Sequence, residues 1–356
     1  MAARRVAITR VGGPDVLRVQ EFQAPPPASG EIAVAVRAAG VNFADVFCRL
    51  GLYEAAPPIP FAPGFEVAGE VAAAGAGVTG FRPGDRVLAV TRFGGYASRV
   101  NVAAALARPL PSGWSFEEGA AFPVAFLTAW HGLVTIGRLG AGETVVVQSA
   151  AGGVGTAACQ IARALGARVI GTVGSEAKRE TARAAGASEV LVSRTYDVWD
   201  EIAGMSPGVD LIFDAVGGRG LRRGFRALRH GGRLVSYGFA SMMPRGGMRN
   251  WPLLAWRWLR TPRFSPFELT FQNRTAAGFN LVHLFDRVEL FEQSFLRLEE
   301  LAASGRINPW IGAVFPYTQA AAAHERIQSR GSTGKLILAF PPSDSVTGGP
   351  DSREKP

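Results

Sequence analysis

The pattern of apolar and polar positions changes along the chain, and its first part has the period of strands. Residues 1–122 alternate apolar and polar positions in runs such as EIAVAVRAAG and FEVAGEVAAAG, which is typical of half-buried strands. Proline and glycine separate these runs, as in PPPASG and RPGD, because proline blocks helix hydrogen bonds and glycine adopts unusual backbone angles. We therefore predict that this part is mostly strand and turn.

From about Ser115 the pattern becomes an alternation of helices and strands. The segment EEGAAFPVAFLTAWHGLV has helical spacing, with acidic residues at its start. The predicted strands that follow are 143–148, 167–174 and the runs SEVLVS, VDLIFDAVG and GGRLVSYGF, and the predicted helices are 153–166 and EAKRETARAAG. Because the strands are continuously apolar and alternate with helices, we predict an α/β region with a parallel sheet covered on both faces.

The C-terminal part predicts a further strand, TAAGFNLV, and an amphipathic helix that ends at Gly305. The last strand, KLILAF, is expected to join the N-terminal body and to make that domain discontinuous. The predicted domains are 1–122 with 285–340, and 123–284 with an insert at 241–268. Residues 341–356 are rich in proline, serine, glycine and charge, and they predict a disordered tail.

Composition narrows the class of protein. A chain of 356 residues with 47% hydrophobic and 19% charged residues suits two globular domains and excludes a mostly disordered chain. No apolar run reaches the roughly 20 residues that cross a bilayer, and we expect no secretory signal. The net charge is +9, but no dense basic run with a nucleic-acid motif occurs, so we expect no nucleic-acid partner. Two cysteines suit a reducing cytoplasm.

A Gly-rich turn between a predicted strand and a predicted helix is the main chemical signal. In SAAGGVGTAACQ, Gly152, Gly153 and Gly155 let the backbone approach a pyrophosphate, and the helix start offers N–H groups to it. The GxGxxG pattern is incomplete, since Ala150 stands where its first glycine would be. The alternative is a tight turn with no ligand, but the strand–turn–helix context favours a dinucleotide site.

The end of the second strand of this unit indicates NADPH rather than NADH. NAD sites usually have a carboxylate there, whereas this chain has TVGS at 172–175, followed by Lys178 and Arg179. A small, neutral strand end beside a cation suits a 2′-phosphate. Glu176 is the exception, and we expect its side chain to point outward.

Seven stretches occur in an order that is specific to one superfamily. They are AAGVNFADVFCRLGLY (38–53), PFAPGFEVAGEV (60–71), FRPGDRV (81–87), AAFPVAFLTAWHGL (120–133), the Gly-rich segment 149–178, FDAVGG (213–218) and STGKLIL (332–338). With these stretches the chain resembles the medium-chain dehydrogenases/reductases, and within them the zinc-free, zeta-crystallin-like quinone oxidoreductases. FQNRTAAGFNL (271–281) further resembles their vesicle amine transport-like branch. The resemblance implies a GroES-like, mostly-β catalytic domain and a Rossmann cofactor domain.

The resemblance also implies that the site holds no metal. Zinc-using relatives have a Cys shortly after the glycine that is Gly40 here, and a His in a GHE motif. This chain reads GVNFAD and GFE at these places, and Phe65 stands where the His would be. Phenylalanine cannot coordinate zinc, and two cysteines are too few for the four-Cys zinc lobe.

The reaction that the resemblance implies is hydride transfer from NADPH to a quinone or an α,β-unsaturated carbonyl, in a cleft between the domains. The resemblance implies that Asn42 and Thr128 lie at the ribose and nicotinamide. It also implies that Asp45 and Tyr53 lie on the active-site loop. Tyr53 would hydrogen-bond a substrate carbonyl. Structural alternatives stay open: Asn42 shapes a turn, Asp45 caps a helix over 44–50, and Tyr53 only packs.

Further positions carried over from the resemblance would bind the cofactor. They are Gly152, Gly153, Val154, Gly174, Ser175, Lys178, Arg194, Tyr237, Gly238, Phe239, Phe279, Asn280 and Lys335. Arg194 would compensate for Ser193, which replaces a tyrosine that relatives often have near the 2′-phosphate. Phe279 and Asn280 would flank the nicotinamide, and Lys335 would reach the phosphate side. A homodimer through strand 275–280 is also implied, because that strand would pair with its twin.

The insert has an unusual composition. Residues 245–263 contain five arginines and three tryptophans, and the next acidic residue is Glu268. Two interpretations stay open: a lid over the substrate cleft, which we prefer, and docking of 245–267 at an anionic membrane surface. Two other functions also stay open, an enoyl-thioester reductase for carrier-bound chains and a non-catalytic nucleotide-binding protein that docks on membranes or partners.

Overall fold

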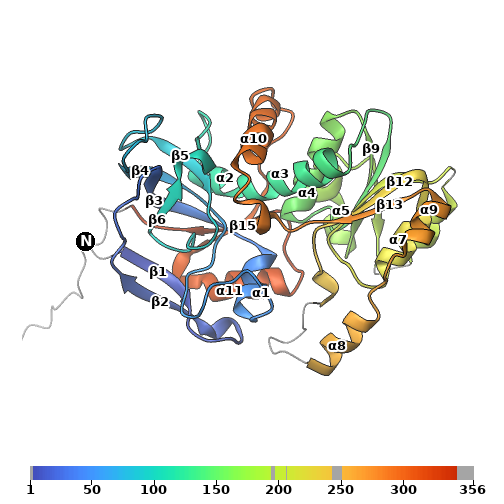
Figure 1. The fold of residues 1–356 in the computed structure, drawn as a ribbon, viewed down its shortest axis with the longest axis horizontal. Helices are drawn as coiled ribbons and strands as arrows, with labels where there is room; N and C mark the ends of the chain where they lie inside the picture. Colours follow the sequence, from blue (N-terminus) through green and yellow to red (C-terminus); the bar gives the residue numbers. More distant parts are fainter. Residues whose placement is uncertain (1–2, 194–196, 206, 243–250, 343–356) are drawn as a thin grey trace, which may run out of the picture.

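The computed structural model describes residues 3–193, 197–205, 207–242 and 251–342. Two sheets organise the chain, one in each of two parts that lie side by side (Figure 1). A separate antiparallel hairpin joins β1 (Ala3–Ile8) and β2 (Leu17–Phe22). The main apolar core contains residues from both sheets, so the two parts pack directly against each other.

The first sheet is mixed and contains strands from both ends of the chain. Its strands are β3 (Glu31–Val41), β4 (Glu66–Ala74), β5 (Arg86–Val90), β6 (Arg99–Ala103), β7 (Ala107–Pro109), β14 (Ile311–Pro316) and β15 (Lys335–Ala339). Their order is β14-β15-β3-β4-β5-β7, and β6 pairs with β3. β15 has the mostly apolar sequence KLILA and is buried, and it pairs antiparallel with β3. The end of the chain therefore completes the N-terminal body.

The second sheet is parallel, as the strand–helix alternation predicted. Its strands are β8 (Thr144–Val147), β9 (Arg168–Val173), β10 (Glu189–Val192), β11 (Val209–Asp214), β12 (Leu228–Ser236) and β13 (Thr275–Gly278). The order β10-β9-β8-β11-β12-β13 is that of a doubly wound dinucleotide-binding sheet. The strand order reverses between β8 and β11, and ligands of such sheets bind beyond the carboxyl ends of the strands at that point.

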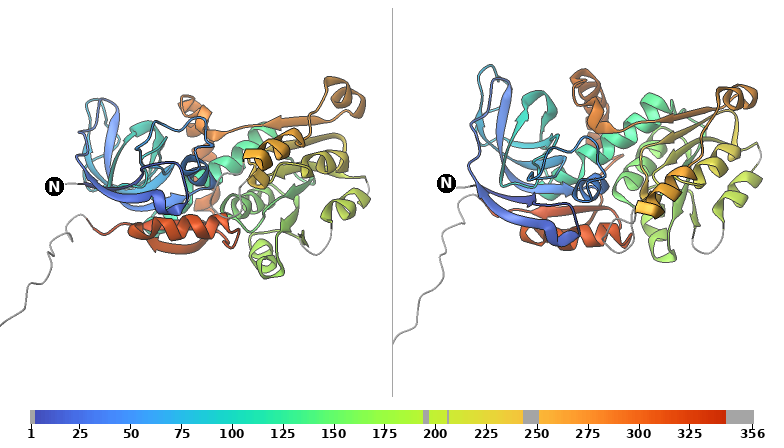
Figure 2. Two further views of the ribbon diagram at one scale, coloured as in Figure 1. Left: turned by 90° about the horizontal axis from the view of Figure 1, so that it is seen from below. Right: turned by 60° about the horizontal axis from the view of Figure 1, so that its bottom comes forward.

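Helices surround both sheets. They are α1 (Phe43–Arg49), α2 (Phe116–Ala121), α3 (Pro123–Trp130), α4 (Gly153–Ala164), α5 (Arg179–Ala184), α6 (Val198–Gly204), α7 (Gly220–Ala227), α8 (Trp251–Leu259), α9 (Pro266–Gln272), α10 (Val288–Ala303) and α11 (Ala320–Gln328). Figure 2 shows the red C-terminal helix α11 beside the blue N-terminal strands, and α11 contacts α1. The Asn42 loop and the C-terminal segment are thereby brought to one place.

One helical stretch of the described residues is long and apolar enough to cross a membrane by length and composition. It runs from Phe116 to Ile136, through α2, α3 and a π-helical turn, and 72% of its most apolar window is buried in the protein. Helices in the core of soluble proteins pass the same test. The stretch includes α3, which packs on α4 and carries Thr128.

Candidate active site

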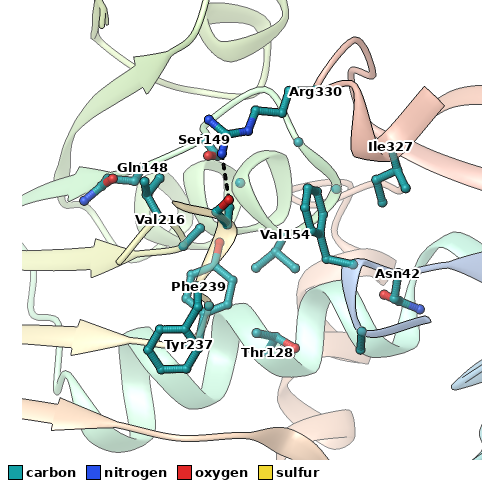
Figure 3. A pocket seen from close by; sticks show the side chains of 18 of the residues that line it. Asn42, Thr128, Gln148, Ser149, Val154, Val216, Tyr237, Phe239, Ile327 and Arg330 are labelled. Carbon is teal, nitrogen blue, oxygen red and sulfur yellow. Dashed lines mark hydrogen bonds between the residues drawn. The ribbon is translucent and has the colours of Figure 1, made fainter. Parts of the chain in front are cut away.

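A cavity of about 1550 Å³ lies between the two sheets, and residues of both parts line it (Figure 3). It lies at the carboxyl ends of the parallel strands, where the strand order reverses. Fifteen predicted site residues line it: Asn42, Tyr53, Thr128, Gly152, Gly153, Val154, Gly174, Ser175, Lys178, Tyr237, Gly238, Phe239, Phe279, Asn280 and Lys335. Two predicted residues remain: Asp45 does not line the cavity, and Arg194 lies outside the described residues.

The Gly-rich turn has the close backbone approach that the sequence predicted. A Cβ added to Gly155 would lie 2.1 Å from the carbonyl oxygen of Ser149, so only glycine fits where the turn enters α4. Gly152 is the N-cap of α4 and offers no side-chain acceptor. The first N–H groups of a helix have no partner within the helix, so those of α4 are available to an anion at the cavity wall.

The segment before β15 holds this turn from the other side. The N–H of Gly334 donates to the carbonyl oxygen of Ala151 at 2.8 Å, and Gly152 and Gly334 form a parallel bridge. A Cβ on Gly153 would lie 3.2 Å from Cδ of Lys335. The turn of the parallel sheet and the C-terminal segment therefore form one wall of the cavity.

Lys335 is directed to Asn42 and Glu66. Its Nζ donates to Oδ1 of Asn42 at 2.6 Å and forms an ion pair with Glu66, and both charged side chains are buried. Nδ2 of Asn42 donates to Oε1 of Glu66 at 3.0 Å, and the second carboxylate oxygen accepts from the N–H of Val124 at 2.7 Å. We predicted that Lys335 reaches the phosphate side, but the pull of the buried Glu66 carboxylate holds its ammonium at the Asn42 end. Glu66 is not among the residues predicted from the sequence, although a charged residue in the apolar run FEVAG was a signal.

Asp45 has a structural position instead of a catalytic one. It is fully buried, and its carboxylate accepts from the N–H groups of Asn42 and Gly64, each at 2.8 Å, and from the hydroxyl of Tyr96 at 3.2 Å. Burial raises the pKa of Asp45 to about 7 against the lowering effect of these hydrogen bonds. The contact with Asn42 completes a capping box at the start of α1, which is the capping alternative.

Tyr53 and Asn280 come from distant parts of the chain and meet at the cavity. The hydroxyl of Tyr53 donates to Oδ1 of Asn280 at 3.0 Å, and the Tyr53 ring packs edge-on against Phe65 at 5.8 Å between centroids. Desolvation raises the pKa of Tyr53 to about 12, so the phenol stays protonated at neutral pH. This pair puts a hydrogen-bond donor beside an aromatic wall.

The central wall of the cavity is aromatic. Thr128 lies on α3 with little exposure, and one turn later His131 packs edge-on against Phe279 at 4.8 Å. Tyr237 stacks on Phe213 at 4.2 Å, and burial raises the pKa of its hydroxyl far above the usual range. Of these rings, Tyr237 and Phe279 line the cavity, and Phe213 and His131 support them from behind.

The end of the cavity beyond β9 carries positive charge. Gly174, Ser175 and Lys178 line it, and a Cβ on Gly174 would meet no atom within 4 Å. Nζ of Lys178 donates to the carbonyl oxygens of Arg330 and Ser332 at 2.7 and 2.6 Å. In this way the C-terminal loop is fixed beside the strand end.

Two other charged residues define this end. Glu176 is mostly exposed and pairs with Arg179, so it points outward as expected. Arg330 lines the cavity and donates to the carbonyl oxygen of Ala240 at 2.6 Å, and Figure 3 shows it at the opposite end from Thr128. Arg330 is not among the residues predicted from the sequence, because no local motif marks it and it reaches the site from another part of the chain.

The described part of the insert does not cover the cavity. None of residues 241–242 and 251–268 lines it, and Figure 1 shows α8 at the lower edge of the molecule. The preferred lid interpretation is therefore not supported for these residues. The described residues also contain no group of three or more His, Cys, Asp or Glu side chains that could hold a metal ion.

The comparisons with known proteins agree with this geometry. Residues 28–112 match the alcohol dehydrogenase GroES-like domain family, and residues 153–297 match the zinc-binding dehydrogenase family. The chain is 37% identical to the human synaptic vesicle membrane protein VAT-1 homolog, over 94% of this chain and 86% of that protein. It is 35% identical to the quinone oxidoreductase of Sus scrofa, over 94% of this chain and 96% of that protein.

A solved structure has the same fold over almost the whole chain. The Escherichia coli quinone oxidoreductase complexed with NADPH superposes with a TM-score of 0.83 at 32% identity, covering 95% of this chain and all of that one. The predicted pair of a GroES-like and a Rossmann domain is thereby confirmed. The chain belongs to the medium-chain dehydrogenase/reductase superfamily, in the family of zinc-free quinone oxidoreductases and VAT-1-like proteins.

Proposed function

We propose that this chain is an NADPH-dependent reductase that transfers hydride to a neutral quinone or α,β-unsaturated carbonyl. The observation that carries the proposal is the single cavity that joins a Gly-rich helix start and a basic end to an aromatic wall with a phenol donor. NADPH supplies the hydride when bound, and the protein provides binding, orientation and exclusion of water. The NADPH-bound Escherichia coli relative supports the cofactor assignment.

In this proposal the cofactor spans the cavity along the Gly-rich turn. The N–H groups at the start of α4 bind the pyrophosphate, and the open space beside Gly174 accepts the adenosine ribose. Arg330, Lys178 and Ser175 bind the 2′-phosphate, since two of them are cationic and all line the same end. Arg194 lies outside the described residues, and its role at the 2′-phosphate stays a prediction from the sequence. Phe279 and Tyr237 position the nicotinamide together with Gly238 and Phe239.

The substrate end is suited to a neutral, flat acceptor. Apolar side chains surround it: Phe43, Phe47, Leu52, Phe65, Val124, Phe279 and Phe285. The charge of Lys335 is neutralised by Glu66, so Lys335 offers no unpaired positive charge to an anionic substrate. Asn42 is held with a fixed amide orientation, and the Tyr53 hydroxyl is a donor for the substrate carbonyl. Thr128 lies against the reacting ring.

We also propose the domain limits and the dimer inferred from the sequence. Residues 1–122 and 285–340 form the catalytic domain, and 123–284 form the cofactor domain. β13 pairs with β12 on one side and has no partner strand on its other side within the described part of the chain. Such an edge suits pairing with the same strand of a second copy, which would extend the sheet across a two-fold axis.

The test is a steady-state assay of NADPH oxidation with ortho- and para-quinones, enones and a crotonyl thioester. We expect turnover with quinones or enones and a higher kcat/KM for NADPH than for NADH. Turnover confined to the crotonyl thioester would favour the enoyl-thioester reductase, and oxidation of neither cofactor with any acceptor would contradict a catalytic function. Arg330→Met is expected to lower the NADPH preference by about tenfold or more, since one charge-assisted hydrogen bond contributes about 1.5–3 kcal/mol.

A further inference from the structure

The segment 328–335, which runs from the last residue of α11 to the first residue of β15, contacts three separate parts of the cavity. Arg330 lies at the end beyond β9, and the N–H of Gly334 donates to a carbonyl oxygen of the Gly-rich turn at 2.8 Å. Nζ of Lys335 donates to Oδ1 of Asn42 at 2.6 Å. The 328–335 segment therefore reaches both the place proposed for the 2′-phosphate and the place proposed for the nicotinamide ribose.

Both ends of the 328–335 segment are bonded to one helix, α1. Asn42 caps the start of this helix and accepts from Lys335. Arg49 is the last residue of the helix, and its Nη2 donates to Oε1 of Gln328 at 2.7 Å. Arg49 is fully buried, and a buried guanidinium that loses a hydrogen bond is costly. The contact with Gln328 therefore fixes the start of the segment relative to α1.

The middle of the segment is held by the two cations that the proposed function assigns to the 2′-phosphate. Nζ of Lys178 donates to the carbonyl oxygens of Arg330 and Ser332 at 2.7 and 2.6 Å. The guanidinium of Arg330 donates to the carbonyl oxygen of Ala240 at 2.6 Å. A phosphate forms stronger hydrogen bonds with cations than a peptide carbonyl does, so an anion at this end competes for both side chains. Its binding therefore changes how these cations hold the segment.

The backbone of the segment is strained at the residue that carries one of these cations. Arg330 has a φ of 58°, in the left-handed region that disfavours residues other than glycine. Such a conformation persists only where surrounding contacts hold it, and here they include the bonds to Lys178 and Ala240. Residues 330–333 lie in neither helix nor strand. A change in these contacts is therefore free to shift the backbone that leads to Lys335.

We propose that the 328–335 segment makes the rate of hydride transfer, and not only cofactor affinity, depend on the 2′-phosphate. When Arg330 and Lys178 bind a 2′-phosphate, they hold the segment in one conformation, because only that conformation gains these bonds. Lys335 then holds Asn42 in the orientation that the nicotinamide ribose requires. This role rests on the proposed NADPH-dependent activity and adds to it a segment that determines cofactor specificity.

The first test needs no turnover and uses adenosine 2′,5′-bisphosphate and 5′-AMP, which differ only in the 2′-phosphate. Hydrogen–deuterium exchange of the full chain is measured by mass spectrometry in peptides that cover 328–335 and the start of α1. At saturation we expect the bisphosphate to slow exchange in both peptides about fivefold or more, and 5′-AMP to leave it unchanged. Equal protection by the two nucleotides, or protection confined to 174–178, would overturn the proposal.

The second test separates the rate of hydride transfer from affinity. Single-turnover oxidation of saturating NADPH and of saturating NADH is followed with one water-soluble quinone. The nicotinamide is the same in both cofactors, so a difference in rate comes from the protein. We expect NADPH to react about fivefold or more faster. Equal rates with unequal affinities would overturn the role of the segment and leave the proposed reductase intact, whereas oxidation of neither cofactor would contradict the reductase itself.

A double variant separates the segment from α1. Arg49→Met with Gln328→Leu removes both partners of their contact, so that no buried charge is left unpaired. We expect this variant to bind adenosine 2′,5′-bisphosphate in calorimetry and to react with NADPH and NADH at equal single-turnover rates. A rate difference that persists in it would overturn the proposal. Both tests above use the unmodified chain and decide the proposal if the double variant does not fold.

The matched control breaks a different contact between the same two parts of the molecule. Gln160→Leu removes two hydrogen bonds between α4 and the backbone of Asn308, outside the segment and the cavity lining. The control is expected to unfold at lower temperature but to keep the rate difference between NADPH and NADH. Loss of that difference in the control would overturn the proposal, because general loosening between the two parts would then explain the effect.

Discussion

The ammonium of Lys335 donates a hydrogen bond to Oδ1 of Asn42 at 2.6 Å. This contact joins the start of the last strand to the residue that caps α1, near the other end of the chain. Glu66 closes the arrangement by pairing with Lys335 and accepting from Nδ2 of Asn42. The amide of Asn42 is thus held in one orientation at the cavity wall, which the proposed role in orienting the nicotinamide ribose requires.

We predict that Lys335→Met lowers the free energy of unfolding by about 3–5 kcal/mol, because it leaves the buried Glu66 carboxylate without its cation. Adding Glu66→Gln to Lys335→Met is expected to recover much of the lost unfolding free energy, since the buried negative charge is then also removed. Urea unfolding of the single and double variants measures both effects. The control is Arg10→Met, which removes a solvent-exposed ion pair with Asp15 and is expected to change stability little. Equal effects of the two single variants would contradict the prediction.

We predict that Tyr53→Phe lowers kcat/KM for a quinone or enone about tenfold, because the substrate carbonyl loses one hydrogen bond of about 1–1.5 kcal/mol. The pKa of about 12 keeps this hydroxyl protonated, so the defect is expected to be constant between neutral pH and pH about 9. Initial rates across this range provide the measurement.

Tyr96→Phe is the matched control for Tyr53. Its hydroxyl is fully buried and bonds Asp45 and His324 away from the cavity. The variant is therefore expected to unfold at lower temperature while it keeps kcat/KM. Unchanged turnover in Tyr53→Phe would remove that residue from the mechanism.

We predict that Gly174→Ala keeps the thermal stability of the protein but raises KM for NADPH several-fold. A Cβ at Gly174 meets nothing within 4 Å in the protein alone, yet it would project into the space proposed for the adenosine ribose. Gly80→Ala adds a methyl group at another position with no atom within 4 Å, outside the cavity lining, and is expected to leave both quantities unchanged. An unchanged KM in Gly174→Ala would place the cofactor elsewhere.

His324 is predicted to make the fold sensitive to acid. Its ring is fully buried against Tyr96, and desolvation lowers its pKa to about 3. The unfolded chain takes up this proton near pH 6.5 and the folded chain does not, so stability falls as pH drops from about 6.5 toward 3. His324→Gln is expected to reduce the slope of the unfolding free energy in this range.

Asp45 serves as a comparison for His324, because its protonation makes the stability change with pH in the opposite direction. Its pKa is about 7 in the fold, so the folded chain binds a proton that the unfolded chain has lost, and stability falls as pH rises from about 4 to 7. Asp45→Asn is expected to remove that decline. Urea unfolding at a series of pH values measures both slopes, and parallel curves for the two variants and the unmodified chain would refute the assignment.

The local sequence pattern was sufficient to predict the helices, the strands and the Gly-rich turn. The alternating runs predicted β3 and β4, and the short β-branched runs predicted β8 and β9, although most residues of all four strands are buried. The place of Gly155 between strand and helix was readable because the steric requirement is local. The ordered family motifs predicted most of the residues that line the cavity. They did not predict in which direction each of these side chains points.

Orientation depended on contacts between distant parts of the chain. The sequence alone determined a GroES-like body, a parallel dinucleotide-binding sheet and the residues around their shared cleft. Only the tertiary structure turned Lys335 toward Glu66, buried Asp45 beneath the site, brought Arg330 to the end of β9 and directed α8 outward. A side chain's direction follows the charge and space around it, and these come from segments hundreds of residues away, which no local pattern contains.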